Sequence, residues 1–175
     1  YSAGQWKDER ESNLLDGAAH FYGCYECKDG KYISIGSIEP QFYASLIENM
    51  ELDASKFSNQ FDKNLWPNLK ELIGLRFKEK TRDEWCKIFT GKDICFAPVL
   101  SLEESLNNQH NLDRETFVEV AGIKQPAPAP RFSRTESEIK HPPLKVGSNT
   151  PEIIESLSSK IDVSALSDKK IIRLD

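Results

Sequence analysis

One short run, Ser37 to Tyr43, constrains the fold of this chain more than any other. Its residues predict the end of a strand followed directly by the first turn of a helix. Pro40 suits the first helical position, where a backbone N–H has no partner inside the helix, and this makes Glu39 the N-cap. Helices favour Ser, Thr, Asp and Asn at that position rather than Glu. A residue that breaks a local rule at such a junction indicates a functional role, and the helix N-terminus favours an ionised carboxylate there.

The charge of the chain argues against several classes of partner. Its 175 residues carry a net charge of −5 and a sequence pI near 5.3, whereas nucleic acids and anionic membranes both require a basic face. We therefore predict no nucleic-acid partner and no membrane partner. No apolar run approaches the length of a membrane span, and no targeting signal is visible in the sequence.

The order of apolar and turn residues predicts an α+β fold. Two apolar segments flank Asp29 and Gly30, which indicates an antiparallel hairpin, and Pro98 restricts a later strand to an edge. Helical spacing and two capping boxes predict the helices. Because strands pair as a hairpin rather than through β-α-β units, we expect a short, mainly antiparallel sheet with several helices. The strands are expected within 21–27, 31–37, 94–100 and 116–120, and the helices within 40–50, 66–80, 81–91 and 101–106.

The character of the chain changes after Gly122. Residues 124–149 hold five of the nine prolines, so this stretch is expected to be an extended strap that cannot build a sheet interior. We expect two helices after the strap, one that begins at Thr150 and one that covers Val163–Leu174. We expect four segments: a linker from a missing N-terminal domain (1–12), the small α+β domain (13–123), the Pro-rich strap (124–149) and a helical tail (150–175).

The tail helices need another surface on which to dock, because a short helix pair rarely holds itself together. We therefore predict partial exposure of Ile153, Leu157 and Ile171, or association between copies that covers them. The chain begins at Tyr1 rather than Met, which favours a piece of something longer.

Cysteine and histidine do not suggest a metal or redox centre. Cys24 and Cys27 have redox or metal spacing, but the strand alternation places them on opposite faces and no second pair supports them. We interpret the cysteines as reduced thiols. The histidines His20, His110 and His141 have no ligand spacing, so we predict no metal. His110 and His141 are expected on the surface, and His20 in a loop at the start of a strand.

Few other side chains suggest catalysis by themselves. No Ser, Cys or Thr has the context of an activated nucleophile, and the glycines are too scattered to form a phosphate loop. Asp16 and Glu39 remain as carboxylates that would be capable of acid–base work. The sequence alone does not place these two side chains together.

The segment Asn13–Tyr22 resembles the N-M-L-D-G-G-A-P-F/Y-Y motif of the α-methylacyl-CoA racemases, which belong to the family III CoA transferases. The resemblance is strongest over Gly36–Tyr43, and its order and spacing fit nearly the whole chain. His20 stands where the family usually has Pro, and Ala18 where it usually has Gly. Further similar segments lie at 25–32, 66–67, 81–89, 93–100 and 128–135.

The resemblance implies a partner domain and a role for each candidate residue. Members begin with a larger α/β domain that binds most of CoA and carries the catalytic His and Asp, and two chains interlock as a homodimer. By resemblance, Glu39 matches the glutamate that orients that His, and Tyr22, Ile38 and Asp16 match positions at or near the acyl pocket. The acyl-CoA thioester is then the substrate, and no separate cofactor is expected.

Three functional hypotheses remain open from the sequence. In the first, the chain is part of an isomerase that epimerises the α-carbon of 2-methylacyl-CoA thioesters in branched-chain fatty acid or bile acid metabolism. This chain by itself would then be inactive. The second is CoA transfer between acids by the same family, and the third is a non-catalytic dimerisation or binding module. The end of the chain, Ile171–Asp175, carries no peroxisomal tripeptide. The family suggests a mitochondrial or peroxisomal enzyme.

Overall fold

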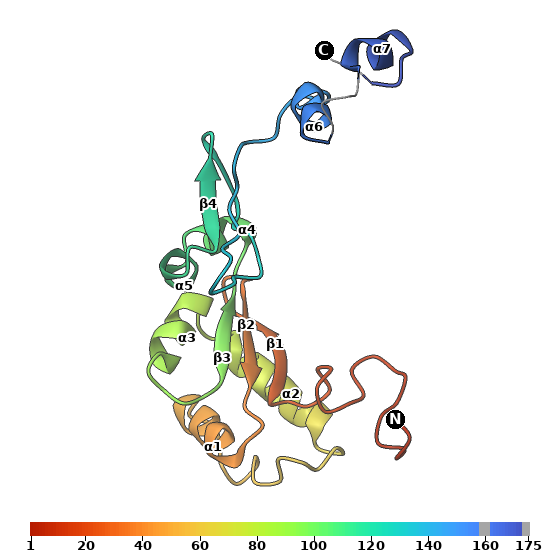
Figure 1. Ribbon diagram of the computed structural model, residues 1–175. Helices are drawn as coiled ribbons and strands as arrows, with labels where there is room; N and C mark the ends of the chain where they lie inside the picture. Colours follow the sequence, from red (N-terminus) through yellow and green to blue (C-terminus); the bar gives the residue numbers. More distant parts are fainter. Residues whose placement is uncertain (158–161, 173–175) are drawn as a thin grey trace. The chain divides into compact units, whose positions relative to one another are not determined.

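The computed structural model describes residues 1–157 and 162–172, and the side chain of Leu157 lies outside this description. The chain divides into two compact units, an N-terminal unit (residues 1–102) and a C-terminal unit (residues 103–175). The elements of the first are β1 (Tyr22–Glu26), β2 (Tyr32–Gly36), α1 (Pro40–Asn49), α2 (Trp66–Phe77), α3 (Arg82–Phe89) and β3 (Phe96–Val99) (Figure 1). The second contains most of α4 (Leu102–Leu106), then α5 (Gln109–Asp113), β4 (Phe117–Val120), β5 (Ile123–Pro126), α6 (Thr150–Leu157) and α7 (Val163–Asp168).

A three-stranded antiparallel sheet organises the N-terminal unit, with β2 between β1 and β3. The predicted hairpin joins β1 to β2, and Tyr22 pairs with Gly36 at its open end. Pro98 pairs with Ile33 on β3, which is an edge strand as predicted. An edge position tolerates proline because that strand has one side without ladder hydrogen bonds. The α+β fold class is therefore confirmed.

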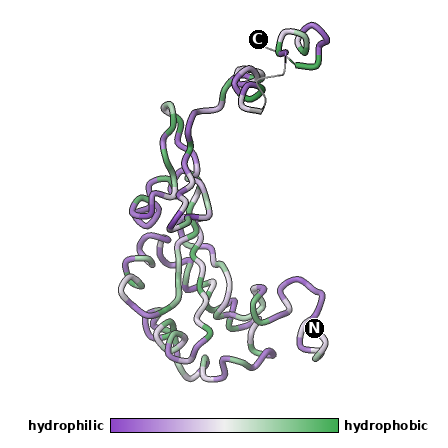
Figure 2. The backbone as a smooth tube through the Cα atoms, viewed as in Figure 1, coloured by the Kyte–Doolittle hydropathy of each residue, from purple (hydrophilic) through white to green (hydrophobic). Residues whose placement is uncertain are grey.

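The core of the N-terminal unit lies against one face of this sheet. Tyr25, Ile33 and Ile35 are buried on that face, whereas Cys24 on the opposite face is exposed. Cys27 is buried, so the predicted separation of the two thiols is confirmed. Figure 2 shows the segment before β1 coloured mostly as polar, in keeping with its exposure.

Aromatic rings fill much of this core. Phe77 has no exposed surface, and its ring stacks on that of Tyr25 with centroids 5.2 Å apart. Trp85 meets Phe77 edge-on, and its indole N–H donates a 2.9 Å hydrogen bond to the Phe77 carbonyl. The buried indole thereby satisfies its polar atom, as buried Trp generally requires.

A local capping box begins α3, whereas a contact with a distant residue follows the end of α2. Thr81 and Glu84 form the predicted capping box at the start of α3. The helix α2 ends at Phe77, three residues before the prediction, and the carbonyl of Lys80 accepts a hydrogen bond from the backbone N–H of Lys28. The chain after Phe77 thus bonds to the β1–β2 turn instead of continuing the helix.

Two elements of the C-terminal unit differ from the sequence expectation. Strand β5 pairs with β4 where the sequence predicts the beginning of an extended strap. Ala121 and Gly122 both have positive φ (53° and 79°), which is the backbone of a tight hairpin turn. Helix α5 replaces the predicted polar loop around His110, because the Asn108 side chain accepts the His110 backbone N–H and caps it. His110 is exposed, as expected.

The tail forms two short helices, close to the prediction. Helix α7 ends at Asp168, and Lys170 has a φ of 57° while the Ile171 N–H bonds back to the Leu166 carbonyl. This is the Schellman arrangement that terminates many helices; the predicted end at Leu174 lies outside the described residues. The predicted exposure is confirmed for Ile153 and Ile171, at 54% and 64%.

The division into units does not coincide with the expected segment boundaries. It falls after Leu102, inside the expected small domain (13–123), and Lys124–Pro126 of the expected strap belong to β5. The boundaries proposed for the linker, strap and tail stay predictions about a longer protein.

Candidate functional site

The junction between β2 and α1 presents one carboxylate to solvent. Glu39 has extended backbone angles (φ −69°, ψ 143°) and stands immediately before Pro40, the first residue of α1. A residue before proline is held in this region by the pyrrolidine ring. Glu39 is the N-cap, as predicted, but its side chain makes no capping hydrogen bond, and the residue is exposed. The carboxylate is therefore open to a partner from outside the unit.

Buried hydrogen bonds fix the backbone that leads to Glu39. The Ile38 N–H donates to the Gly36 carbonyl at 2.9 Å, which closes a three-residue turn. The fully buried Ser37 hydroxyl donates to the Ile94 carbonyl at 2.5 Å. The Gln60 side-chain amide donates to the carbonyls of Ser37 and Ile38 at 3.1 and 2.8 Å. The turn is thus tied to two distant parts of the chain.

Tyr22 and Ile38 lie at the same junction as Glu39. Tyr22 is paired with Gly36, and a Cβ on that glycine would lie 3.4 Å from the tyrosine ring. The absence of a side chain at Gly36 therefore lets the ring lie over the strand end. Both Tyr22 and Ile38 are half-buried and pack against the core. A hollow of about 380 Å³ opens on this side of the sheet, lined by Tyr22, Cys24, Ser34, Gly36, Cys95 and neighbouring residues.

The Asp16 side chain forms hydrogen bonds within its own loop and none with Glu39. Its carboxylate accepts hydrogen bonds from the backbone N–H groups of Ser12, Asn13 and Ala18 and from the Asn13 side chain. Partial burial raises the pKa of Asp16, but these hydrogen bonds outweigh it, and the pKa lies below its ordinary value. The loop passes close to β1, with the Gly17 Cα 3.7 Å from where a Gly23 Cβ would be. Its role at the acyl pocket stays a prediction.

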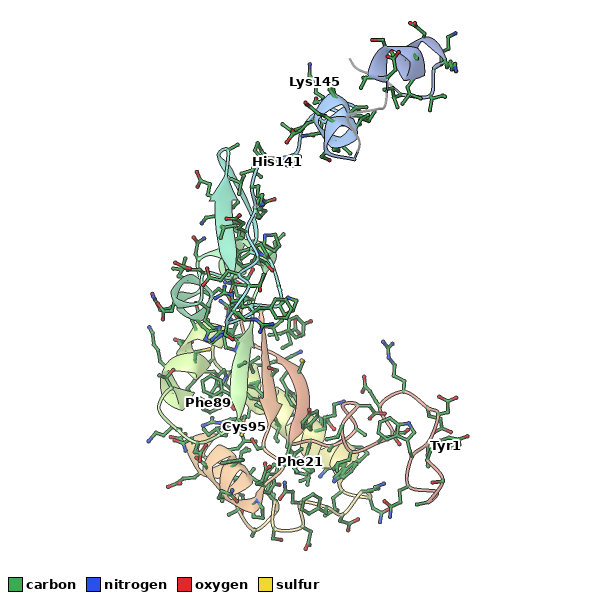
Figure 3. All side chains as sticks on the ribbon, in the orientation of Figure 1. Tyr1, Phe21, Phe89, Cys95, His141 and Lys145 are labelled. Carbon is green, nitrogen blue, oxygen red and sulfur yellow. The ribbon has the colours of Figure 1, made fainter. Side chains whose placement is uncertain are left out.

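Cys95 is a neighbour of the junction that the sequence did not single out. It is exposed, lies just before β3 (Figure 3), and has a positive φ of 57°. Its backbone carbonyl accepts the Gly36 N–H at 2.8 Å. Desolvation raises the pKa of the Cys95 thiol, and the negative charges of Glu39 and Asp93 raise it further. Cys95 and the Glu39 carboxylate therefore share one electrostatic environment, and Cys95 is held as the neutral thiol.

Comparison with known families decides the ancestry of this arrangement. Residues 1–150 match the family described as CoA-transferase family III. The chain belongs to this family. It is 38% identical to the mouse (Mus musculus) α-methylacyl-CoA racemase over 98% of its length, and 38% identical to the human (Homo sapiens) one over 95%. It covers 46% and 44% of those proteins, so it spans about half the length of these relatives.

Other proteins that match this chain are more distant. The human succinyl-CoA:glutarate CoA-transferase is 25% identical over 90% of this chain, which covers 38% of that protein. Among solved structures, Rv3272 of Mycobacterium tuberculosis matches with a TM-score of 0.62 at 16% identity, over 77% of this chain and 39% of that one. The structural match confirms the fold alone.

His20 lies in the core and not at the junction. Its Nε2 is 2.7 Å from the Tyr43 hydroxyl, and that hydroxyl donates to the Phe57 carbonyl at 3.1 Å. Because the Tyr43 hydroxyl proton is used in the bond to Phe57, the imidazole proton lies on Nε2, which donates it to the Tyr43 oxygen. Burial lowers the pKa of His20 to about 4, and its buried Nδ1 has no partner among the described residues. The predicted place before β1 is right, and the imidazole is a neutral core group.

Within residues 1–157 and 162–172, no group of three or more His, Cys, Asp or Glu side chains is arranged to hold a metal ion. None of the helices in those ranges is long and apolar enough to cross a bilayer.

The residues that fix the junction are those that sequence reasoning missed. Gln60 lies in a segment without clear periodicity, more than twenty residues after the turn it contacts, and no local motif marks it. Ser37 was visible as a strand end, but its bond to Ile94 depends on the pairing of β2 with β3.

Proposed function

We propose that this chain is the smaller domain of an enzyme that epimerises the α-carbon of 2-methylacyl-CoA thioesters. The observation that carries the proposal is the 38% identity to two α-methylacyl-CoA racemases across nearly the whole chain. Identity to the human succinyl-CoA:glutarate CoA-transferase over a similar length is 25%. The half-length coverage of the racemases leaves room for a larger domain that supplies the catalytic His and Asp.

The chemistry of epimerisation gives Glu39 a defined role. Removal of a weakly acidic α-proton and its return to the opposite face require two acid–base groups that flank the carbon. In the proposal these groups are the His and Asp of the larger domain, and Glu39 accepts a hydrogen bond from one nitrogen of that His. Such a carboxylate fixes the tautomer of the imidazole and raises its basicity. An exposed carboxylate with no capping bond, on a rigid backbone, supports this role.

The remaining parts of the proposal follow from the same assignment. Tyr22 and Ile38 border the acyl group beside Glu39, and Asp16 shapes the loop next to β1. The whole enzyme acts as an interlocked homodimer in mitochondria or peroxisomes, uses no cofactor beyond the CoA of its substrate, and binds neither nucleic acid nor membrane.

The test replaces Glu39 in the intact protein that carries this chain. Glu39→Gln keeps the shape and removes the charge, and we expect exchange of the α-proton of a 2-methylacyl-CoA in D₂O to slow by about 10²-fold, within the range for acid–base groups. Glu48→Gln, on the exposed side of the same helix, is the control and should leave the rate unchanged. An unaltered rate in Glu39→Gln would remove Glu39 from the mechanism.

The alternatives give different outcomes in the same preparation. A family III transferase would move CoA from an acyl-CoA to a free acid and would exchange no α-proton. A non-catalytic module would do neither in the intact protein. The chain alone should show no exchange, and the sequence upstream of Tyr1 should contain the catalytic His and Asp.

A further inference from the structure

We propose that Gln60 is the positioning residue of this site: its side-chain amide holds the carbonyls of Ser37 and Ile38 and thereby sets the direction in which Glu39 points. The inference rests on the proposed function, because it assigns Gln60 a role only through Glu39. It adds a residue outside every motif that carries the family resemblance.

The side-chain amide of Gln60 bonds to the carbonyls of both Ser37 and Ile38, and we call this pair of hydrogen bonds the clamp. A side-chain amide nitrogen has two protons, and Gln60 Nε2 donates to two successive carbonyls, at 3.1 Å to Ser37 and 2.8 Å to Ile38. Carbonyls of consecutive residues in an extended strand point to opposite sides. Next to the turn closed by the Ile38 N–H and the Gly36 carbonyl, both carbonyls lie within hydrogen-bonding reach of one nitrogen. The clamp therefore recognises the turned backbone and not an extended one.

Gln60 is itself held in place by the core. The residue is 8% exposed, and its backbone carbonyl accepts a 2.9 Å hydrogen bond from the indole N–H of Trp66. Trp66 is 3% exposed and is the first residue of α2. A continuous path of hydrogen bonds thus joins α2 to the turn through Gln60. Groups fixed by packing and second-layer hydrogen bonds hold their geometry more closely than groups on a free loop.

The side chain of Glu39 depends on this path for its direction. It makes no capping hydrogen bond to its own helix, so the backbone on either side sets the point and direction from which the side chain extends. Pro40 fixes the helix side, and Gln60 with Ser37 fixes the strand side. A displacement of about 1 Å in a catalytic geometry can slow a reaction by about 10²-fold. Loss of the clamp should therefore weaken the action of Glu39 and leave its charge in place.

The decisive experiment is a double-mutant cycle in the intact protein. Gln60→Met keeps the length and burial of the side chain and removes both donors. We expect kcat for α-proton exchange to fall by about tenfold, with KM within about twofold. In the Glu39→Gln background the same substitution should cause no further fall, because the two residues act as one unit. A merely structural role would lower the amount of folded enzyme and add to the effect of Glu39→Gln.

The control is a buried hydrogen bond outside the path. Tyr25→Phe removes the hydroxyl that donates to the His20 carbonyl, and it should lower the melting temperature without changing kcat per folded molecule. If Gln60→Met folds poorly, Gln60→Leu also removes both donors without burying a charge, and kcat per folded molecule should fall similarly.

Each outcome decides between the two proposals. An additive loss in the cycle, or a normal kcat in both Gln60 variants, overturns the positioning role while Glu39 keeps its own. A normal rate in Glu39→Gln alone removes Glu39 from the mechanism, and the role of Gln60 falls with it. Absence of α-proton exchange in the intact parent protein overturns the proposed function itself.

Discussion

The two units of this chain are stabilised in different ways. Among the described residues, every buried hydrophobic side chain belongs to the N-terminal unit except Ile154. The C-terminal unit contains large apolar side chains that face solvent, such as Val146 at 91% exposure and Phe132 at 56%. It has a hairpin, capped helical turns and hydrogen bonds from Arg131 to the carbonyls of Arg114 and Glu115.

This difference indicates which part of the chain carries its own folding free energy. Burial of apolar area is the main favourable term in folding, and local hydrogen bonds contribute only about 1 kcal/mol each in net terms. The N-terminal unit therefore has the means to hold the Glu39 junction rigid by itself. The C-terminal unit buries too little apolar surface to match it.

The largest effect is expected where aromatic rings are packed. Phe77→Ala removes a ring that contacts Tyr25, Trp85 and Phe89 and has no exposed surface, and it should lower the free energy of unfolding by about 3–5 kcal/mol. The same change at the exposed Phe132 of the C-terminal unit should shift it by no more than about 0.5 kcal/mol.

Urea unfolding followed by tryptophan fluorescence measures both variants, because all three tryptophans lie within residues 1–102. Comparable losses from the two substitutions would mean that the units share one core and are not stabilised in different ways.

The parts of the fold that the sequence predicted are those set by neighbouring residues. Thr81 and Glu84 form a capping box from residues three apart, and Pro40 selects the start of α1 because it lacks an N–H. The hairpin follows from Asp29 and Gly30. In each case the physical cause lies within one turn of the chain, so the pattern is readable without knowledge of the tertiary structure.

The parts that were missed depend on contacts between distant residues. Gln60 reaches the turn before Glu39 only after the chain has folded around α1, and the ring of His20 is buried by Tyr43 and Phe57. Strand β5 was not predicted, because the prolines of this segment indicated an extended strap. Residue type alone therefore located Glu39, while the residues that hold its backbone required the structure.

The second effect is a loss of stability in mild acid that belongs to the N-terminal unit. Burial lowers the pKa of His20 to about 4 from an ordinary value of 6.5, so the unfolded chain binds a proton at a higher pH than the folded one. Stability is complete above pH 6.5 and falls as the pH drops toward 4. Between pH 7.5 and pH 5 the free energy of unfolding should decrease by about 2 kcal/mol from this residue.

Unfolding curves at several pH values, again read by tryptophan fluorescence, test this dependence. His20→Phe should flatten the slope, since the replacement does not titrate. His110→Gln, an exposed residue of α5 in the C-terminal unit, should preserve it. An unchanged slope in His20→Phe would show that other groups cause the acid sensitivity.

The third effect compares helix caps in the two units. Thr81→Ala removes the side chain that accepts the Glu84 N–H at the start of α3, and the transition reported by tryptophan should lose about 1 kcal/mol. Asp162→Ala removes the equivalent bond to the Ala165 N–H at the start of α7. It should leave that transition unchanged, because α7 lies in the C-terminal unit and has no buried side chain. Equal losses would show that the two units unfold together.

The exposed isoleucines of the tail are expected to have the smallest effect on unfolding but a clear effect on association between copies. Ile153→Ser combined with Ile171→Ser should change the tryptophan-reported free energy of unfolding by no more than about 0.5 kcal/mol, since both side chains are mostly exposed. The same pair should reduce association between copies, because exposed apolar side chains are covered when chains meet. Light scattering over a range of concentrations measures this, with Leu75→Ser, exposed on α2 at 58%, as the matched control in the N-terminal unit. A parent chain that stays monomeric at every concentration would contradict the idea that the tail needs a partner surface. An equal decrease in association in Leu75→Ser would show that association does not depend specifically on the tail.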